Sequence, residues 1–214
     1  MRISISRGFF EFFYWLERKP FHSHYNIFIP YQKNMPNNLT NKLNSSSIFL
    51  LGREDAPQVS ALEKSCFATG WDVPMYERVL LPQKVALVQL EKNSSPAELP
   101  SELFVVGYFV ETELLGYVSM RVILSIHCAE IYNVAVKESQ RKQGIAHKLL
   151  SRSIAFLAKL GVSEMNLEVR AGNVPAISLY TRNGFVACGV RKKYYPDGED
   201  ALLMERMENP AESP

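Results

Sequence analysis

The second half of the chain changes its hydrophobic pattern at Val136. Before this point, three runs rich in β-branched and aromatic residues are separated by short turns, which is typical of an antiparallel meander. These runs cover residues 103–110, 114–124 and 129–136. After it, apolar positions recur every three or four residues over 145–160, and Gly161 follows. This spacing predicts a helix with one buried side and a glycine stop.

The remaining segments continue a strand–helix alternation. We predict strands over 47–51, 164–170, 185–195 and 200–207, a further candidate strand over 84–90, and helices near 55–66, 73–81 and 173–183. Asp55 and Asn173 are the expected N-caps, and Gln58 follows Asp55 at capping-box spacing. The fold class expected is therefore α/β (α+β), with a mixed, mostly antiparallel sheet flanked by helices on both faces.

Composition narrows the class of protein. The chain has 214 residues, 47% of them hydrophobic, and a net charge of +2, so one sizeable core is expected and direct nucleic-acid binding is not. The three cysteines, Cys66, Cys128 and Cys188, have no CxxC or Cys/His metal spacing. We therefore expect buried, reduced thiols, no metal and a cytoplasmic location. No apolar run reaches the roughly 18 residues of a membrane span.

The two ends of the sequence differ from its middle. Residues 1–45 combine an aromatic segment with an Asn-rich polar stretch, and we expect a mobile extension or linker. If this segment is instead a transit peptide, the compartment is organellar. A domain is expected over 46–208, followed by a disordered tail over 209–214.

Positive charge precedes the helix that starts near Ile145, in the stretch RKQGIAHKLL. Cations are unfavourable at a helix N-terminus, where the backbone N–H groups already carry positive partial charge. An anionic ligand would reverse this, and Gly144 would let the backbone approach a pyrophosphate closely. The alternative is a basic, solvated loop, because neither GxxxxGK[ST] nor GxGxxG is present.

Three longer stretches follow one another in order: YNVAVKESQRKQGIAHKLL, LEVRAGNVPAISLYTRNGF and RKKYYPDGEDALLMERM. Together they resemble the GNAT superfamily of acetyl-CoA-dependent N-acetyltransferases, and within it the RimI-type branch that acetylates the N-terminal alanine of a ribosomal protein. The resemblance covers 132–207 strongly and 47–124 more weakly. It implies acetyl-CoA as cosubstrate and the N-terminus of a ribosomal protein as partner.

The resemblance also implies roles for individual residues. The general base matches Glu168, the general acid matches Tyr180, and a coenzyme-contacting asparagine matches Asn173. The strand that pairs with pantetheine matches Val134, Ala135 and Val136. The pyrophosphate loop matches Arg141, Lys142, Gln143, Gly144, Ile145, Ala146 and His147.

Elementary chemistry supports a carboxylate base. Alternation along 164–170 places Glu168 on the face opposite Met165, Leu167 and Val169. An α-amino group has a pKa of about 7.7–8.0, against about 10.4 for lysine, a difference of roughly 3.5 kcal/mol in deprotonation at neutral pH. A carboxylate therefore suits an N-terminal amine better than a lysine, without excluding lysine.

The leaving thiolate and the thioester carbonyl need donors of their own. A phenol, with a pKa near 10, is a weaker acid than a thiol near 8.5 by about 2 kcal/mol, which a hydrogen bond from Tyr180 to the sulfur could offset. Backbone N–H groups of Val134 to Val136 could bind the carbonyl oxygen if their strand bends away from its neighbour.

Other candidates rank lower. His127 and His147 are alternative bases, and Trp71, Tyr194 and Tyr195 could border a peptide groove. The acidic turn Asp197, Glu199 and Asp200 could attract a basic N-terminus or be an ordinary solvated turn. This turn is about two residues shorter than the RimI-type pattern, which makes the peptide preference less secure than acetyl-CoA use. Acetylation of lysine or a small amine, and a silent acyl-CoA-binding module, remain rival functions.

Overall fold

The computed structural model describes residues 47–67, 70–87 and 103–208, whose strands form one sheet of eight strands in the order β2-β1-β3-β4-β5-β6-β8-β7. The strands are β1 (Ser47–Leu50), β2 (Val85–Ala86), β3 (Leu103–Val110), β4 (Glu113–Ile123), β5 (Cys128–Val136), β6 (Glu164–Arg170), β7 (Val186–Arg191) and β8 (Ala201–Met207). Every neighbouring pair is antiparallel except β5 with β6, which confirms the expected meander and mixed sheet.

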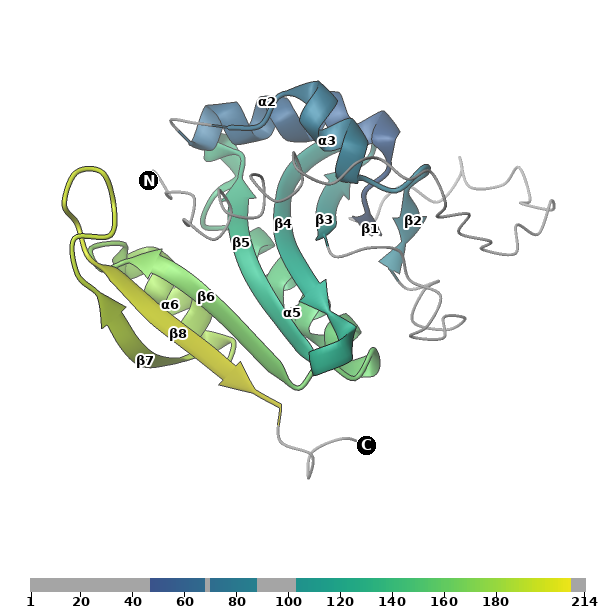
Figure 1. Ribbon diagram of the computed structural model, residues 1–214. Coiled ribbons are helices and arrows are strands. Elements are labelled where there is room, and N and C mark those ends of the chain that lie inside the picture. The colour runs from purple at the N-terminus through teal and green to yellow at the C-terminus, as the bar shows by residue number, and fades with distance from the viewer. Residues whose placement is uncertain (1–46, 68–69, 88–102, 209–214) are drawn as a thin grey trace.

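Helices cover the two faces of the sheet (Figure 1). One face carries α2 (Ala56–Cys66) and α3 (Val73–Val79), whose apolar side chains pack on β3 and β4. The other face carries α5 (Ile145–Lys159) and α6 (Val174–Arg182), packed on β4, β5 and β6. Short 3-10 turns cover Arg53–Asp55, Leu124–Ile126 and Glu138–Gln140. The expectation of helices on both faces is confirmed.

The first turn of α5 packs closely on β4. A Cβ atom at Gly116 would lie 2.9 Å from the carbonyl oxygen of Ala135 and 3.2 Å from side-chain atoms of Ile145 and Leu149. Leu149 is fully buried in the same core. The glycine in the middle of β4 therefore lets α5 begin directly against the sheet, which fixes the position of the loop before it.

The sheet opens between β5 and β6 (Figure 1). The two strands pair only where Cys128 to Ile131 face Glu164 to Leu167, and they diverge beyond these residues. On its other side, β5 contains a bulge, because Ser119 of β4 is opposite Asn133 while Met120 is opposite Ile131. A bulge bends and twists the strand that carries it. The bend that the proposed carbonyl donors require is therefore present.

Some boundaries differ from the sequence-based predictions. The predicted helix over 73–81 ends at Val79, and the predicted strand over 185–195 covers only Val186–Arg191. Asn173 caps α6 as predicted, through its side-chain oxygen and the Ala176 N–H. Gln58 forms no capping box, because its amide instead bonds the β3–β4 turn at the carbonyl of Thr112 and the N–H of Leu114.

Several predictions fall on residues that the structure does not describe. These are the extension over 1–45, the tail over 209–214 and the segment 88–102, which includes the end of the candidate strand over 84–90; in the described part of that strand, β2 covers Val85–Ala86. Within the described ranges, no helix combines the length and the apolar character needed to cross a membrane.

The cysteines correct one expectation. All three thiols in the described ranges are free, but only Cys66 is buried, whereas Cys128 is half-buried and Cys188 is exposed on β7. Cys188 lies on an edge strand of the sheet, where every residue except the half-buried Gly189 is exposed.

Candidate functional site

A cleft of about 880 Å³ lies beside the end of β5, between the first turn of α5 and helix α6. It is lined from β5 by Val134, Ala135 and Val136, from the following loop and α5 by Glu138, Gln140, Arg141, Lys142, Gly144, Ile145, Ala146 and His147, from α6 by Pro175, Ala176, Leu179, Tyr180 and Arg182, and from the end of α2 by Cys66 and Phe67. The cleft therefore occupies the space that a strand adjoining β5 would otherwise fill.

Backbone groups of β5 face this space. The Lys137 N–H donates to the carbonyl of Leu115, 2.8 Å away, so these two residues belong to the hydrogen-bonded pairs of the β4–β5 ladder. Bonded and non-bonded pairs alternate in an antiparallel ladder, so the N–H and C=O groups of Val134 and Val136 point away from β4. The carbonyl of Val136 shows this directly, since it accepts a hydrogen bond from Arg141.

The N-terminus of α5 offers further backbone donors to the cleft. Gly144 adopts a left-handed φ of 77° immediately before the helix, and Lys142 has a φ of 64°. The Lys148 N–H is the first to bond within the helix, to the carbonyl of Gly144. The preceding amides of Ile145, Ala146 and His147 have no intrahelical acceptor, and an anion is favoured at such an end.

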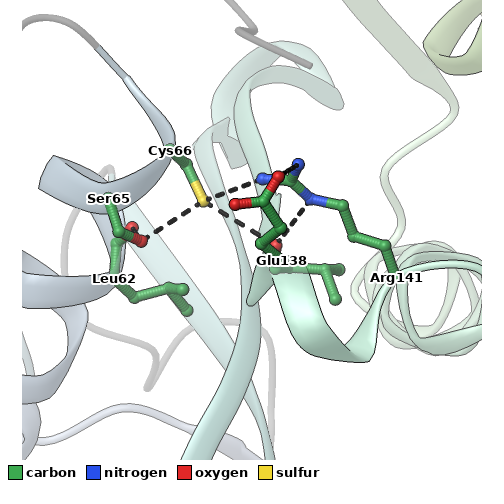
Figure 2. Close-up of polar contacts among 6 residues, drawn as sticks. Leu62, Ser65, Cys66, Glu138 and Arg141 are labelled. Carbon is green, nitrogen blue, oxygen red and sulfur yellow. Dashed lines mark hydrogen bonds and ion pairs between the residues drawn. The ribbon is translucent and has the colours of Figure 1, made fainter.

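Arg141 bridges the loop, β5 and the end of α2 (Figure 2). Its Nε donates to the Val136 carbonyl at 3.2 Å, and Nη2 lies 3.8 Å from the Sγ of Cys66. Its Nη1 lies 3.5 Å from the carboxylate of Glu138. Cys66 itself donates to the same Val136 carbonyl at 3.7 Å. The guanidinium is thus held at the rim of the cleft, next to a backbone acceptor that a ligand lying along β5 would also meet.

Tyr180 of α6 lines the cleft, whereas Asn173, the N-cap of that helix, lies outside the lining. The ring of Tyr180 packs edge-on against Phe185, at 5.9 Å between ring centroids. Burial raises the pKa of Tyr180, and the nearby Tyr195 raises it further, so the phenol stays protonated. Asn173 caps the helix with its oxygen, while its buried Nδ2 has no acceptor within the described part of the chain.

Glu168 lies on β6 beyond the point where the strands separate, outside the residues that line the cleft. Its Oε1 lies 3.2 Å from a guanidinium nitrogen of Arg191, and its side chain is 10% exposed. The other oxygen, Oε2, is buried without a hydrogen-bond partner among the described residues. Burial, and next the charge of Glu168, raises the pKa of Tyr195 to about 12. Tyr195 therefore lies near both Glu168 and Tyr180.

The structure brings most of the predicted residues together. Of the predicted site residues, Gln143, Asn173 and Glu168 are outside the cleft lining, and Gln143 bonds the side chain of Gln140 instead. The sequence-based prediction did not include Cys66 or the α6 residues Pro175, Ala176, Leu179 and Arg182, although Ala176 precedes Tyr180 by one helical turn. His147 lines the cleft, whereas His127 bonds the carbonyl of Gly161 in a turn at the far end of β5.

The acidic turn is neutralised within the molecule. Arg170 of β6 contacts Asp197 at 2.8 Å and Glu199 at 2.5 Å, and its guanidinium lies 4.1 Å from the ring centroid of Tyr195. Asp200 accepts hydrogen bonds from the side chain of Lys192 and from a neighbouring backbone N–H. These carboxylates fasten the β7–β8 connection to β6, which leaves little net charge there to attract a basic peptide.

The described side chains include no group of three or more His, Cys, Asp or Glu residues arranged to hold a metal ion. The described structure assembles backbone amides and a buried phenol along the cleft, with the carboxylate of Glu168 outside its lining. Such a set can bind an anion at one end and move protons at the other.

Comparison with known proteins identifies the family of the chain. Residues 57–185 match the model of the Acetyltransferase (GNAT) family. An N-alpha-acetyltransferase of Saccharolobus solfataricus is 38% identical over 104 residues, which are 48% of this chain and 62% of that protein. The ribosomal protein bS18-alanine N-acetyltransferase of Escherichia coli is 44% identical over 79 residues, 36% of this chain and 53% of that protein. The chain therefore spans less than two thirds of the length of both relatives.

Solved structures show the same fold. The crystal structure of the ribosomal-protein-S18-alanine N-acetyltransferase from Escherichia coli has a TM-score of 0.60 and 26% identity, and the match covers 78% of this chain and 97% of that one.

Proposed function

The chain belongs to the GNAT family of acetyltransferases, and from this membership and the open cleft beside β5 we propose that it transfers an acetyl group from acetyl-CoA to the N-terminal amine of a protein. The observation that carries the proposal is the separation of β5 from β6. It exposes backbone groups of Val134 and Val136 to a ligand and leaves room beside Tyr180.

The residues present fit the coenzyme. The unpaired amides at the start of α5, with Arg141 and Lys142 at the rim, suit a pyrophosphate. The outward N–H and C=O groups of Val134 and Val136 suit an amide-containing arm lying along β5. The buried, unpartnered Nδ2 of Asn173 is a donor still available to such a ligand. When bound, acetyl-CoA supplies an activated acyl group.

The protein's own groups would then manage the protons and the charge. Glu168 would accept one proton from the substrate ammonium, since only the neutral amine has a lone pair. A gap-facing N–H of Val134 or Val136 would bind the carbonyl oxygen as it gains charge. Tyr180, kept protonated by its burial, would place a proton on the departing sulfur. The raised pKa makes this donation less favourable than for an exposed phenol, so a short contact with the sulfur is required.

A ribosomal protein is the partner that the relatives suggest. The ribosomal protein bS18-alanine N-acetyltransferase of Escherichia coli is similar to this chain over 79 residues. The match to the crystal structure of the ribosomal-protein-S18-alanine N-acetyltransferase from Escherichia coli covers 78% of this chain. We propose a ribosomal-protein N-terminus, with alanine as first residue, as the substrate class. Acetylation of lysine or of a small amine is the competing activity.

The test is an acetyl-CoA turnover assay on matched peptides. One peptide has a free N-terminal alanine, a second has that amine blocked but carries an internal lysine, and a third starts with a bulky residue. We expect turnover with the peptide that has a free N-terminal alanine, little or none with the blocked peptide and the peptide that starts with a bulky residue, and a loss of at least about tenfold for both Glu168→Gln and Tyr180→Phe. If the peptide with the blocked N-terminal amine is still acetylated, the substrate group is lysine and not the α-amine. If Glu168→Gln and Tyr180→Phe both have normal rates, the roles proposed for Glu168 and Tyr180 are wrong.

A further inference from the structure

A second carboxylate, that of Glu130 in β5, lies beside Glu168 on the face of the sheet opposite α6. Glu130 is directly opposite Asn166 in the parallel pairing of β5 with β6. Glu168 follows Asn166 by two residues, so its side chain leaves the same face, diagonally across from Glu130. The pairing ends at Ile131 and Leu167, so both carboxylates lie where the strands begin to separate.

Two arginines stand on the outer sides of this carboxylate pair. Arg121 of β4 is directly opposite Glu130 in the antiparallel ladder. Arg191 of β7 contacts the Oε1 of Glu168 at 3.2 Å. In the strand order β4-β5-β6-β8-β7, the charges follow the sequence positive, negative, negative, positive. The arginines therefore balance the pair from outside, while the two carboxylates remain neighbours across the opening.

Buried oxygen atoms next to the two carboxylates have no hydrogen-bond partner among the described residues. The Oε2 of Glu168 is buried and has no hydrogen-bond partner among the described residues, and the whole side chain is only 10% exposed. The nearby hydroxyl of Tyr195 is also buried without a partner there, and that residue is 3% exposed. Burial, followed by the charge of Glu168, raises the pKa of Glu130. A buried oxygen beside a second carboxylate is costly unless a proton or cation is shared with it.

We propose that Glu130 and Glu168 together bind the ammonium group of the incoming substrate and that this pair, rather than Glu168 alone, removes its proton. An ammonium group would bring a positive charge and N–H donors to the unpartnered Oε2 of Glu168 and to the neighbouring carboxylate of Glu130. The proton balance is simple: R–NH₃⁺ gives one proton to the carboxylate pair and becomes R–NH₂, and the pair later returns that proton to solvent. This inference rests on the proposed function, because it assigns a further residue to the same reaction.

A coupled pair suits this task better than one carboxylate. Two like charges in a shared site raise the affinity of the pair for a proton, which brings it closer to the pKa of an α-amine. General bases work best when the two pKa values are close. The charged and titratable groups that face Glu130 are Arg121 of β4, Tyr132 of β5, Glu168 of β6 and Arg191 of β7. Of these, only Glu168 carries the same charge.

The test compares pH profiles of kcat/KM for a peptide with a free N-terminal alanine, using wild type, Glu130→Gln, Glu130→Asp and Glu168→Gln. For Glu130→Gln we expect the KM of the peptide to rise about tenfold and the acidic limb of the profile to move down by about one pH unit. The limb moves down because Glu130→Gln removes one of the two negative charges that together favour binding of the proton. Glu130→Asp, which keeps the charge, should keep the acidic limb near its wild-type position.

Controls separate this inference from the proposed function and from loss of folding. Glu164→Gln removes another carboxylate from the same face of β6, one that accepts a hydrogen bond from Asn166 at 2.7 Å, and its profile should match wild type. Acetyl-CoA affinity measured by calorimetry should be unchanged in Glu130→Gln. If the profile and KM of Glu130→Gln equal those of wild type while Glu168→Gln is impaired, the inference is wrong and the proposed function stands. If wild type acetylates no free N-terminus, the proposed function itself fails.

Discussion

The buried carboxyl group of Glu63 in α2 accepts a hydrogen bond, at 3.3 Å, from the side chain of Asn133, which lies next to the bulge of β5. The same carboxyl accepts from the hydroxyl of Tyr76 and from the N–H of Trp71. Ser60, one turn earlier in α2, donates a hydrogen bond to the carbonyl oxygen of Trp71 at 2.7 Å. A single acid therefore ties the α2–α3 connection to the strand that borders the cleft.

We predict that Glu63 makes stability depend on pH. Burial raises its pKa to about 7, against 4.5 ordinarily, and hydrogen bonds from Tyr76 and Trp71 oppose the rise only partly. Because the folded state holds this proton more tightly, its contribution is complete below about pH 4.5 and is lost as the pH rises through about 7. Urea unfolding between pH 5 and 8 should show wild type losing up to roughly 3 kcal/mol relative to Glu63→Gln.

A control for this effect is Glu138→Gln, which changes a carboxyl group whose side chain is 88% exposed. Its unfolding free energy should follow wild type across the same pH range. Parallel pH curves for wild type and Glu63→Gln would contradict the prediction, since the buried proton would then have no thermodynamic effect.

We predict that Gly144→Ala weakens acetyl-CoA binding. The φ of 77° is strained for alanine by about 1 kcal/mol, and the added Cβ would enter open space, with no atom within 4 Å, where a ligand must approach the amides of α5. The dissociation constant from calorimetry should rise about tenfold. Gly198→Ala is a matched control, because Gly198 has a φ of 83° and equally open surroundings in the β7–β8 connection. It should lower stability similarly while coenzyme affinity stays unchanged.

The guanidinium of Arg141 should contribute to coenzyme affinity through its charge. Charge-assisted hydrogen bonds to phosphate are strong, so Arg141→Ala should raise the dissociation constant of acetyl-CoA by about tenfold or more and flatten its dependence on salt. Arg152→Ala removes a cation from α5 outside the cleft lining and should leave both quantities near wild type. Equal salt dependence in wild type and Arg141→Ala would show that this side chain serves only its contacts with Val136 and Cys66.

We predict that Arg170 determines peptide affinity through the β7–β8 connection. Its contacts with Asp197 and Glu199 hold that connection, and its guanidinium covers the ring of Tyr195. In Arg170→Ala, steady-state kinetics should show a peptide KM raised about tenfold, because Tyr195 is no longer held near Glu168. Acetyl-CoA affinity should not change.

Lys192→Ala tests the specificity of that effect. It removes the 2.7 Å contact with Asp200 from the exposed side of the same connection. If Lys192→Ala raises the peptide KM as much as Arg170→Ala, general loosening of the connection explains the result, and the position of Tyr195 does not.

The sequence predicted helices and strands well where the residues that determine them are close together in the chain. Helix α5 begins at Ile145 as its periodicity indicated, and Asn173 caps α6 because both the cap and the first turn are local in sequence. Burial of Met165, Leu167 and Val169 followed from simple alternation along β6. Boundaries that depend on partners were less accurate, as the early end of β7 at Arg191 shows.

The site was harder to predict where distant strands combine. At the bulge in β5 the β4–β5 register passes from Asn133 to Ile131, and this break in alternation is visible only once the register with β4 is known. Glu130 was not predicted because only the β5–β6 register shows that it lies close to Glu168. Arg191 meets Glu168 across the intervening β8, which no spacing in the sequence indicates.

The divergence of β5 from β6 also means that the sheet of this protein has two unpaired strand edges in its interior, one on β5 and one on β6. In proteins generally, an exposed edge strand can pair with any extended chain that continues its ladder of hydrogen bonds. Here the free edge of β5 would favour an acetyl donor whose arm carries amide groups, because such an arm can form hydrogen bonds with the edge as a neighbouring strand would. A thioester without amide groups cannot form these hydrogen bonds. A small acetyl thioester without such an arm should therefore be a poor donor even at high concentration, which competition against coenzyme A in the turnover assay would reveal.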